Sequence, residues 1–450
     1  MPTTGGSVGS GTRKRPVAVL AVLVVLVVTF SSVPVAQALP GRWTQRNNLR
    51  KLAVKMSNNS LRYLHTTWFR NTYAYSTITI VPDAQGTQQT TQTVEVLVPY
   101  SGFSAGEMPI RSQASALYAT AIALESGYYS ASTVGVSAEE ARRRSVAWTT
   151  GLANSYATDN WGCGWQSPLW VNYLGYGAKR VWPSLPQPTR DLVTRAVAAE
   201  ANHLLAEVPG HYRNAGGWIV NPGNSQAEED AWRASLLIFA AREFPDNPNS
   251  TAWENHGRLY LANAYASPSQ VGGDPRITGS NINPNGTVVN HGRIHPDYML
   301  SQSEFIAKIA LVSADTGTQL PPETRNNLSK VWSGLTRVSF SAKRFAKPGG
   351  TIYRWGKKNT QTSAMYFPQG TDWSRYRRFN AAQMDVEVFA SQLDWRSYNW
   401  AQQHLLYVLK QQSRYGDRHI FPKGATSYPS DEQFAAVTAA EISARLIEMR

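Results

Sequence analysis

Apolar residues recur three and four positions apart over most of the chain, which predicts a mainly helical protein with one apolar face on each helix. The predicted helices span residues 113–125, 138–156, 190–208, 227–244, 251–265, 297–314, 323–338, 381–393, 398–411 and 432–449. Several starts carry helix-initiating residues: Ser137 with Glu140 and Ser225 with Glu228 fit capping boxes, and Pro296 fits a first helical position.

Residues 75–99 break this pattern, because β-branched and polar residues alternate there on both sides of a polar stretch that contains a glycine. This stretch predicts a β-hairpin before the helices. The expected fold class is therefore all-α, with a small N-terminal hairpin. Paired antiparallel helices can close around one core as an (α/α) toroid or an incomplete barrel, with an open helical array as the alternative. The long loops at 267–295 and 339–380 are expected to be functional.

The N-terminus has the pattern of a secretory signal peptide. A basic segment is followed by an apolar run at residues 17–30 and by the small-x-small site Ala36-Gln37-Ala38. The run is too short to span a membrane comfortably, so a protein secreted by the general route and free of the membrane after cleavage is expected. The predicted division is a signal peptide at 1–38, a segment with the hairpin at 39–110 and a helical catalytic domain at 111–450.

Charge narrows the class of partner. The formal net charge is +14, which favours an acidic polysaccharide, a nucleic acid or an anionic surface. Residues 337–378 contain ten basic residues and one acid, Asp372, interleaved with aromatic residues. Rings and cations together suit a negatively charged polymer, although a solvated basic face is an equally simple explanation.

The chain has one cysteine, Cys163, and therefore no internal disulfide. Stability must come from core burial. Cys163 lies in "NWGCGWQ", and its predicted role is that of a small buried apolar residue.

The densest group of chemically active side chains lies within residues 283–300. Asn290, His291, His295 and Tyr298 each have a structural explanation when taken alone, as a turn former, a cap or a core ring. Together they predict a loop that lines a cleft. Two side chains of "NHGR" would bind a carboxylate, and the tyrosine would act as acid or base.

A second group is the acidic run Glu228, Glu229 and Asp230 at the start of a predicted helix. Acids in a first turn favour the helix dipole, which is the simpler explanation. Because Glu228 fits a capping box with Ser225, Glu229 is the better candidate for catalysis.

The third group is the loop of residues 366–378. Its candidate substrate-binding residues, taken together with His295, are Asp372, Trp373, Arg375, Arg377 and Arg378. A planar guanidinium binds a carboxylate through two hydrogen bonds, so one of these arginines is expected to hold a uronic acid. The candidate sugar-stacking rings are Trp161, Trp165, Trp218 and Trp373, although core packing is an equally common role for any one tryptophan.

A metal site is disfavoured. His291 and His295 have the spacing of two ligands on one helical turn, but Gly292 and Pro296 argue against a helix there. A helical His-Glu-x-x-His pattern does not occur in the sequence. Neither a metal nor a cofactor is predicted.

The secretion signal, the long loops and the segments "NHGRIHPDY" and "FPQGTDWSRYRR" resemble the (α/α)-toroid polysaccharide-degrading enzymes, above all the lyases of the alginate and the hyaluronan or chondroitin type. The resemblance covers residues 111–450 as architecture and residue types. It implies Asn290 as neutraliser of a substrate carboxylate, His291 as neutraliser or base, and Tyr298 as acid or base. It also implies a clamping arginine within residues 375–378. The tyrosines that compete with Tyr298 are Tyr353, Tyr366 and Tyr376.

The function expected first is a secreted lyase that cleaves a uronate-containing polysaccharide by β-elimination. This reaction needs donors that neutralise the carboxylate beside C5, because they stabilise the enolate-like intermediate. An inverting glycoside hydrolase is the first alternative, with two carboxylates drawn from Glu229, Asp230, Asp297, Asp372 and Asp385. A non-catalytic binder of polyanions is the second. Nucleic acid is disfavoured as a partner, because the sequence shows no recognised nucleic-acid motif.

Overall fold

The computed structural model describes residues 40–80, 91–99, 107–159, 161–422, 425 and 428–449. The predicted signal peptide and the tip of the predicted hairpin lie outside these residues. Among the helices described, none combines the length and the apolar character that crossing a membrane requires.

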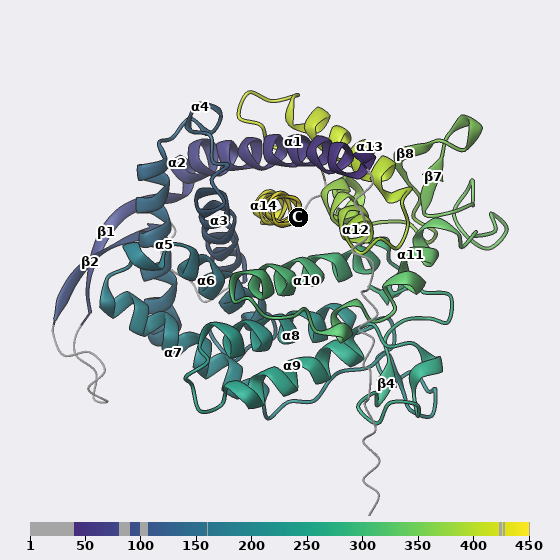
Figure 1. Cartoon of the computed structure of the whole chain (residues 1–450), viewed down its shortest axis with the longest axis horizontal. Helices are drawn as coiled ribbons and strands as arrows, with labels where there is room; N and C mark the ends of the chain where they lie inside the picture. Colours follow the sequence, from purple (N-terminus) through teal and green to yellow (C-terminus); the bar gives the residue numbers. More distant parts are fainter. Residues whose placement is uncertain are drawn as a thin grey trace, which may run out of the picture.

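The described chain is mostly helical, as predicted, with small antiparallel strand pairs (Figure 1). The helices are α1 Pro40–Tyr63, α2 Phe69–Thr72, α3 Glu107–Glu125, α4 Ala131–Val134, α5 Ala138–Thr158, α6 Ser167–Arg180, α7 Gln187–Leu204, α8 Ala227–Glu243, α9 Ser250–Ala264, α10 Pro296–Asp315, α11 Leu328–Thr336, α12 Arg378–Ala390, α13 Ser397–Gln412 and α14 Asp431–Glu448. The strands are β1 Tyr73–Ile80, β2 Gln92–Pro99, β3 Arg213–Asn214, β4 Gly279–Ser280, β5 Val289–Asn290, β6 Arg293–Ile294, β7 Tyr353–Trp355 and β8 Gln361–Met365.

The predicted hairpin is confirmed. Strands β1 and β2 pair antiparallel, from Tyr73 opposite Pro99 to Ile80 opposite Gln92, and β2 packs on α5.

The predicted helices are confirmed, with ends that differ by a few residues, except at 323–338. There the 3-10 turn η4 Pro322–Arg325 is separated from α11 by Asn327, whose φ of 56° lies in the left-handed region. A left-handed residue cannot continue a right-handed helix, so the segment divides in two.

Two long helices, α1 and α6, were not predicted. Helix α1 is rich in Asn and Arg, and only a few apolar residues, such as Leu49, Ala53 and Met56, mark its buried face. Helix α6 contains Gly175 and Gly177, which lower intrinsic helix propensity. A Cβ on Gly175 would lie 2.5 Å from the ring of Phe239, and one on Gly177 would lie 2.8 Å from Leu117. Glycine is therefore required there because α6 packs closely against α8 and α3, a tertiary contact that no local pattern reveals.

The long helices that form the interior contact one another in a closed circuit. The contacts run from α3 to α6, α8, α10, α12 and α14, and α14 returns to α3. Helix α14 also touches α10 and α1, and Figure 1 shows it nearly end-on with α1, α3, α10 and α12 around it. Helices α5, α7, α9 and α13 pack against members of this circuit.

A buried charge network lies inside this circuit. The ammonium group of Lys308 on α10 is 2.6 Å from a carboxylate oxygen of Glu304 and 2.9 Å from one of Glu441 on α14. The hydroxyl of Tyr118 donates to Glu441, and that of Tyr173 donates to Glu304, each at 2.9 Å. Helices α3, α6, α10 and α14 are thus joined by polar groups that satisfy one another away from water.

The prediction for Cys163 is wrong, because its side chain is exposed. Its backbone has a φ of 54°, and its N–H donates to the carboxylate of Glu200 at 2.8 Å. The irregular loop before α6 turns the thiol outward, whereas the neighbouring Trp161 is buried.

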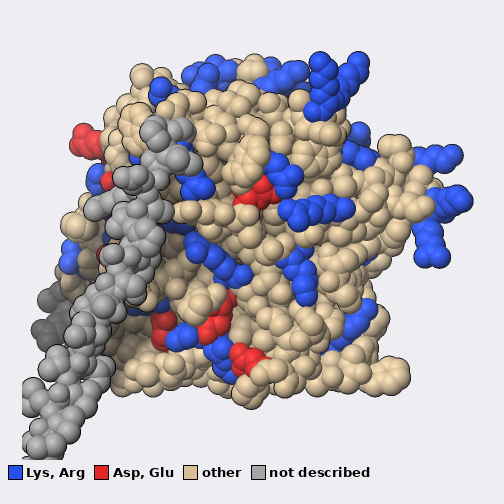
Figure 2. Space-filling view, turned by 45° about the vertical axis from the view of Figure 1, so that its right-hand side comes forward, with Lys and Arg blue, Asp and Glu red and all other residues tan. Residues whose placement is uncertain are grey.

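The surface carries the excess of positive charge that the composition indicates. Figure 2 shows Lys and Arg side chains distributed over one face, with fewer Asp and Glu side chains among them.

Candidate functional site

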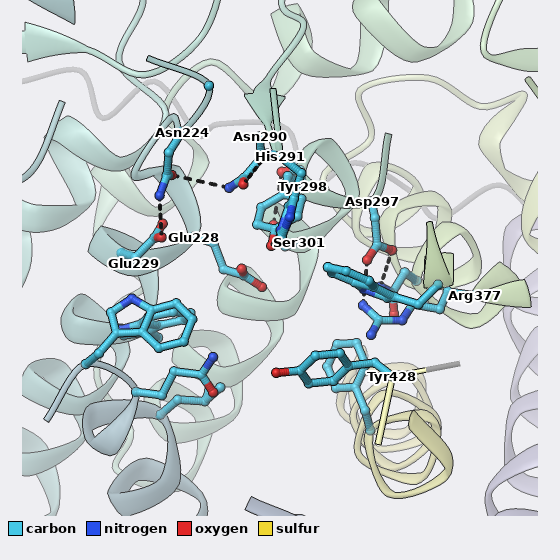
Figure 3. Close-up of a pocket in the computed structure, with 18 of the residues that line it drawn as sticks. Asn224, Glu228, Glu229, Asn290, His291, Asp297, Tyr298, Ser301, Arg377 and Tyr428 are labelled. Carbon is cyan, nitrogen blue, oxygen red and sulfur yellow. Dashed lines mark hydrogen bonds and ion pairs between the residues drawn. The ribbon is translucent and has the colours of Figure 1, made fainter. Parts of the chain in front are cut away.

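A cavity of about 420 Å³ opens where the helices of the circuit begin. Every helix of the circuit contributes a residue from or next to its first turns: Arg111 of α3, Leu169 of α6, Glu228 and Trp232 of α8, Tyr298 and Ser301 of α10, Asn380 of α12, and Phe434 of α14 (Figure 3). A helix N-terminus carries about half a positive elementary charge and free N–H groups. Because several N-termini converge on it, the cavity suits an anionic ligand.

A tight turn places His291 over the cavity. Strands β5 and β6 pair antiparallel and leave only His291 and Gly292 between them. The φ angles of these two residues are 50° and 70°, and a two-residue hairpin of type I′ requires positive φ at both. The "NHGR" segment is therefore a hairpin turn whose tip carries an imidazole.

The imidazole meets the hydroxyl of Tyr298, the third residue of α10. The Nε2 atom of His291 lies 2.8 Å from Tyr298 Oη. Trp373 packs edge-on against the His291 ring with centroids 4.8 Å apart. Pro296 begins α10 as predicted, so the helix start fixes the tyrosine beneath the turn.

Both groups are neutral near pH 7. Burial, His295 and Arg293 lower the pKa of His291 below its usual value, although Asp372 opposes the shift. Burial and the nearby Glu228 and other carboxylates raise the pKa of Tyr298 well above its usual value. In the tautomer with its proton on Nδ1, His291 accepts a hydrogen bond from the phenol through Nε2.

Two amides lie beside this pair. The Asn290 side chain donates to Asn224 Oδ1 at 3.4 Å, and the Asn224 side chain donates to Glu229 at 3.5 Å. Both distances are long for hydrogen bonds. The two NH₂ groups are therefore held in place but weakly engaged, and a ligand carboxylate can compete for them.

Glu228 does not form the predicted capping box. Helix α8 has Gln226 as its N-cap, with a φ of 59° and no side-chain cap bond, and Ser225 Oγ accepts from the N–H of Ala227 instead. The left-handed residue turns Ser225 away from the third helical N–H, which leaves the Glu228 side chain free to enter the cavity.

The Glu228 carboxyl lies in the middle of the cavity (Figure 3). It is half-buried and makes no hydrogen bond or ion pair with any residue in the described parts of the chain. Burial raises its pKa well above the usual value, and so do Glu229, Glu304 and Asp297, against the opposing charge of Arg111. Glu228 is thus a carboxylic acid that keeps its proton to higher pH than usual. Burial also raises the pKa of Glu229.

Arg377 is held by two carboxylates. Its terminal nitrogens lie 2.6 Å from Asp297 on α10 and 2.5 Å from Asp431 on α14. Asp297 also accepts from Asn380 at 2.8 Å. Arg377 lines the cavity, but these pairs occupy its fork, so it joins three helix starts and contributes charge more than free hydrogen-bond donors.

His295 and Asp372 form a pair behind the imidazole. His295 is buried, and its Nε2 lies 3.0 Å from Asp372 Oδ2. Burial opposes ionisation of Asp372, but the hydrogen bond to His295 and its charge lower the pKa of that carboxyl to about 2. The pair ties the His291 hairpin to the loop that carries Trp373.

The structure brings most predicted site residues to this cavity. Those that line it are Glu229, Asn290, His291, Tyr298, Trp165, Trp373 and Arg377. Among the four competing tyrosines only Tyr298 lines it, since Tyr353 and Tyr366 are buried in the core. Trp165 is 60% exposed, so its face is open to a ligand at the cavity edge.

Other predicted residues lie elsewhere. Trp161 is a core ring whose N–H donates to Ser155 at 2.9 Å. Arg375 is exposed and does not line the cavity. Arg378 is buried and donates to the carbonyl oxygens of Ser363 and Arg375. The clamp expected from the 375–378 arginines is therefore reduced to Arg377.

Some lining residues were not predicted as site residues, notably Arg111, Asn224, Glu228 and Tyr428. Glu228 belongs to the acidic run already noted, where only the capping assignment concealed it, and Asn224 lies just before that run. Arg111 and Tyr428 are remote in sequence, and the guanidinium of Arg111 lies 5.3 Å from the Tyr428 ring centroid.

No family model matches the chain, and neither a curated protein nor a solved structure matches it.

Proposed function

We propose that the protein is an exported enzyme that cleaves a uronate-containing polysaccharide by β-elimination. The observation that carries this proposal is the His291–Tyr298 pair, a neutral base hydrogen-bonded to a neutral acid at 2.8 Å. The pair lies beside two weakly engaged amides in a cavity on which helix N-termini converge.

The proposed architecture is an (α/α) toroid. The circuit of α3, α6, α8, α10, α12 and α14 would be its inner layer. In chain order α5 precedes α6, α7 precedes α8, α9 precedes α10, α11 precedes α12 and α13 precedes α14. Such an alternation of outer and inner helices would account for inner-helix N-termini that converge on one cavity.

Two adjacent groups suit the elimination step. The substrate replaces the hydrogen bond between Tyr298 and His291. His291 Nε2 then takes the proton from C5 of the uronate, the C5 electron pair forms the C4–C5 double bond, and the C4–O4 bond breaks. Tyr298 Oη gives its proton to the departing O4. The imidazolium and tyrosinate left behind are hydrogen-bonded, so the proton returns from His291 to Tyr298 and both groups are neutral again.

The substrate carboxylate needs neutral or positive neighbours. The Asn224 and Asn290 amides supply N–H donors, and the helix N-termini and Arg111 supply positive potential. Glu228, when protonated, can donate to the same carboxylate. Donors of this kind act on the charge that develops as C5 loses its proton, and each typically contributes about 3 to 4 kcal/mol.

An inverting hydrolase is supported less well by the same cavity. It needs a protonated carboxylic acid and a second, ionised carboxylate that activates water. Glu228 suits the acid. Asp297 is occupied by Arg377 and Asn380, and the raised pKa of the buried Glu229 disfavours its ionised form. Asp230 and Asp385 do not line the cavity.

The test is product analysis with the wild-type protein. A panel of polyuronates and glycosaminoglycans is incubated with the enzyme while ultraviolet absorbance of the unsaturated uronate and new reducing ends are followed in parallel. The expected result is a rise in both signals for at least one polymer. Reducing ends without the chromophore would mean hydrolysis, and binding without either signal would mean a non-catalytic binder.

A further inference from the structure

A basic arm extends between α11 and α12. We use this name for residues 339–371, which contain β7 and β8 joined through η5 Lys357–Asn359. Figure 1 shows β7 and β8 to one side of the helices. The arm contains no Asp or Glu, so its cations have no acidic neighbour within the same segment.

Five cations of the arm point into solvent. The exposed residues are Lys343, Arg344, Lys347, Lys357 and Lys358. None of them forms an ion pair with another residue in the described ranges. Exposed cations without ion-pair partners, in a segment that contains no acidic residue, are available to an anionic partner.

The rings of the arm are used for packing. Tyr353 is fully buried, with ring centroids 5.5 Å from Trp332 and 5.4 Å from Trp400. Trp355 packs on Trp400 at 4.7 Å, and Tyr366 is buried. The rings predicted to interleave with the cations thus fasten the arm to α11 and α13.

The arm exposes its cations and buries its rings, and this arrangement indicates the class of ligand. Proteins that bind single-stranded nucleic acid present exposed rings on which bases stack. The arm presents cations on a firmly packed base and no exposed aromatic side chain. Lysine ammonium groups act as point charges toward sulfate and carboxylate groups.

The arm is joined to the rim of the cavity. Gln369, near its end, accepts a hydrogen bond from the N–H of Ile294 at 2.6 Å. Ile294 belongs to β6, the strand that follows the His291 turn. No exposed cation of the arm lines the cavity. A long polymer held by the arm can therefore extend toward the cavity without its held portion occupying the reaction site.

We propose that the basic arm is a second binding surface for sulfate and carboxylate groups of an acidic polysaccharide. The assignment of this polymer as the substrate rests on the proposed function. The arm retains the chain between cleavage events, whereas the cavity holds the sugar that reacts.

The test compares two full-length variants that lose five charges each. The arm variant replaces Lys343, Arg344, Lys347, Lys357 and Lys358 with Gln. The control variant replaces the exposed Arg50, Lys51, Lys55, Lys410 and Arg414 of α1 and the α13 end with Gln. Circular dichroism and Tm verify that both fold, and the partial variants K343Q/R344Q/K347Q and K357Q/K358Q serve if the arm variant does not.

Binding is measured on immobilised heparin at several salt concentrations. The arm variant is expected to bind about tenfold more weakly near 0.15 M salt, with a shallower salt dependence, because fewer charges are neutralised on binding. The control variant is expected to change by less than about twofold. Equal weakening of both variants would show that net charge is responsible and would overturn the proposal, as would unchanged binding by the arm variant.

Two further measurements separate the alternatives. Duplex DNA or anionic vesicles bound through the arm as tightly as heparin would overturn the assignment to polysaccharide. If the wild-type protein cleaves a polymer, the arm variant should cleave a short oligosaccharide of it at the wild-type rate. Arm-dependent heparin binding without cleavage of any polymer would support the arm as a binding surface and would overturn the proposed function.

Discussion

The buried network around Lys308 and the cavity around Glu228 lie within the same circuit of helices but differ in how their polar groups are paired. In the network, Lys308 lies between Glu304 and Glu441, and tyrosine hydroxyls complete the hydrogen bonds. In the cavity, Glu228 makes no bond to a described residue. Satisfied polar groups fix one packing of the helices. Polar groups without partners reduce stability, and proteins retain them at sites where a ligand binds.

The largest effect is expected from breaking the network. Lys308→Met should destabilise the protein by about 3 to 5 kcal/mol at pH 8, because two buried carboxylates lose their counter-charge. Even with Lys308 present, burial raises the pKa of Glu441 to about 7. The loss should therefore shrink toward pH 5, where Glu441 takes up a proton. Urea unfolding at both pH values measures this.

Lys51→Met, at an exposed position of α1, is the matched control and should change stability by less than about 0.5 kcal/mol. A Lys308→Met protein as stable as the wild type at pH 8 would mean that the network contributes nothing to holding the helices together.

The next largest effect is expected from replacing the His291–Tyr298 pair in the cavity. His291→Ala and Tyr298→Phe should each lower turnover about a hundredfold or more, because each removes one proton-transfer partner. The helical circular-dichroism spectrum should not change. Tyr376→Phe, in the loop that carries Trp373 but outside the cavity, is the matched control. Near-full activity of either site variant contradicts the assignment of the pair.

How far the sequence predicts this site depends on the range of the interactions. Asn290, His291 and Tyr298 were found because they lie close together in the sequence, beside a helix start that Pro296 marks locally. The partners of Arg377 were not, since Asp297 and Asp431 come from other helices. A guanidinium in a basic loop resembles a ligand clamp until its ion pairs are seen.

The same distinction holds for the fold. Helices α8 and α10 were predicted almost to the residue, because their apolar residues recur at helical spacing along the sequence. Helix α6 was missed because Gly175 is required by close packing against Phe239 on another helix, and the local sequence does not show that contact. Glu228 was assigned to a cap, and the left-handed φ of Gln226 prevents that cap.

The pH dependence of kcat/KM tests whether the base in the cavity is neutral, in contrast to the charged groups of the Lys308 network. Since the pKa of His291 lies below its usual value of about 6.5, kcat/KM should be flat near neutral pH. Below the lowered pKa it should fall about tenfold per pH unit, as the base becomes protonated. A limb centred above pH 7 would show that the essential base is another group.

The smallest effect concerns Glu228, whose replacement is expected to raise the stability of the protein. Its folded-state pKa is raised, so the folded protein retains a proton that the unfolded chain releases above about pH 4.3. Stability from this group is complete below that pH and is lost as pH rises toward the folded pKa. Glu228→Gln removes the loss and should stabilise the protein by about 1 kcal/mol at pH 8, with no gain at pH 4. Thermal unfolding at both pH values measures the difference. If the variant were instead less stable at pH 8, the carboxylate would have a stabilising partner, and the contrast with the Lys308 network would fail.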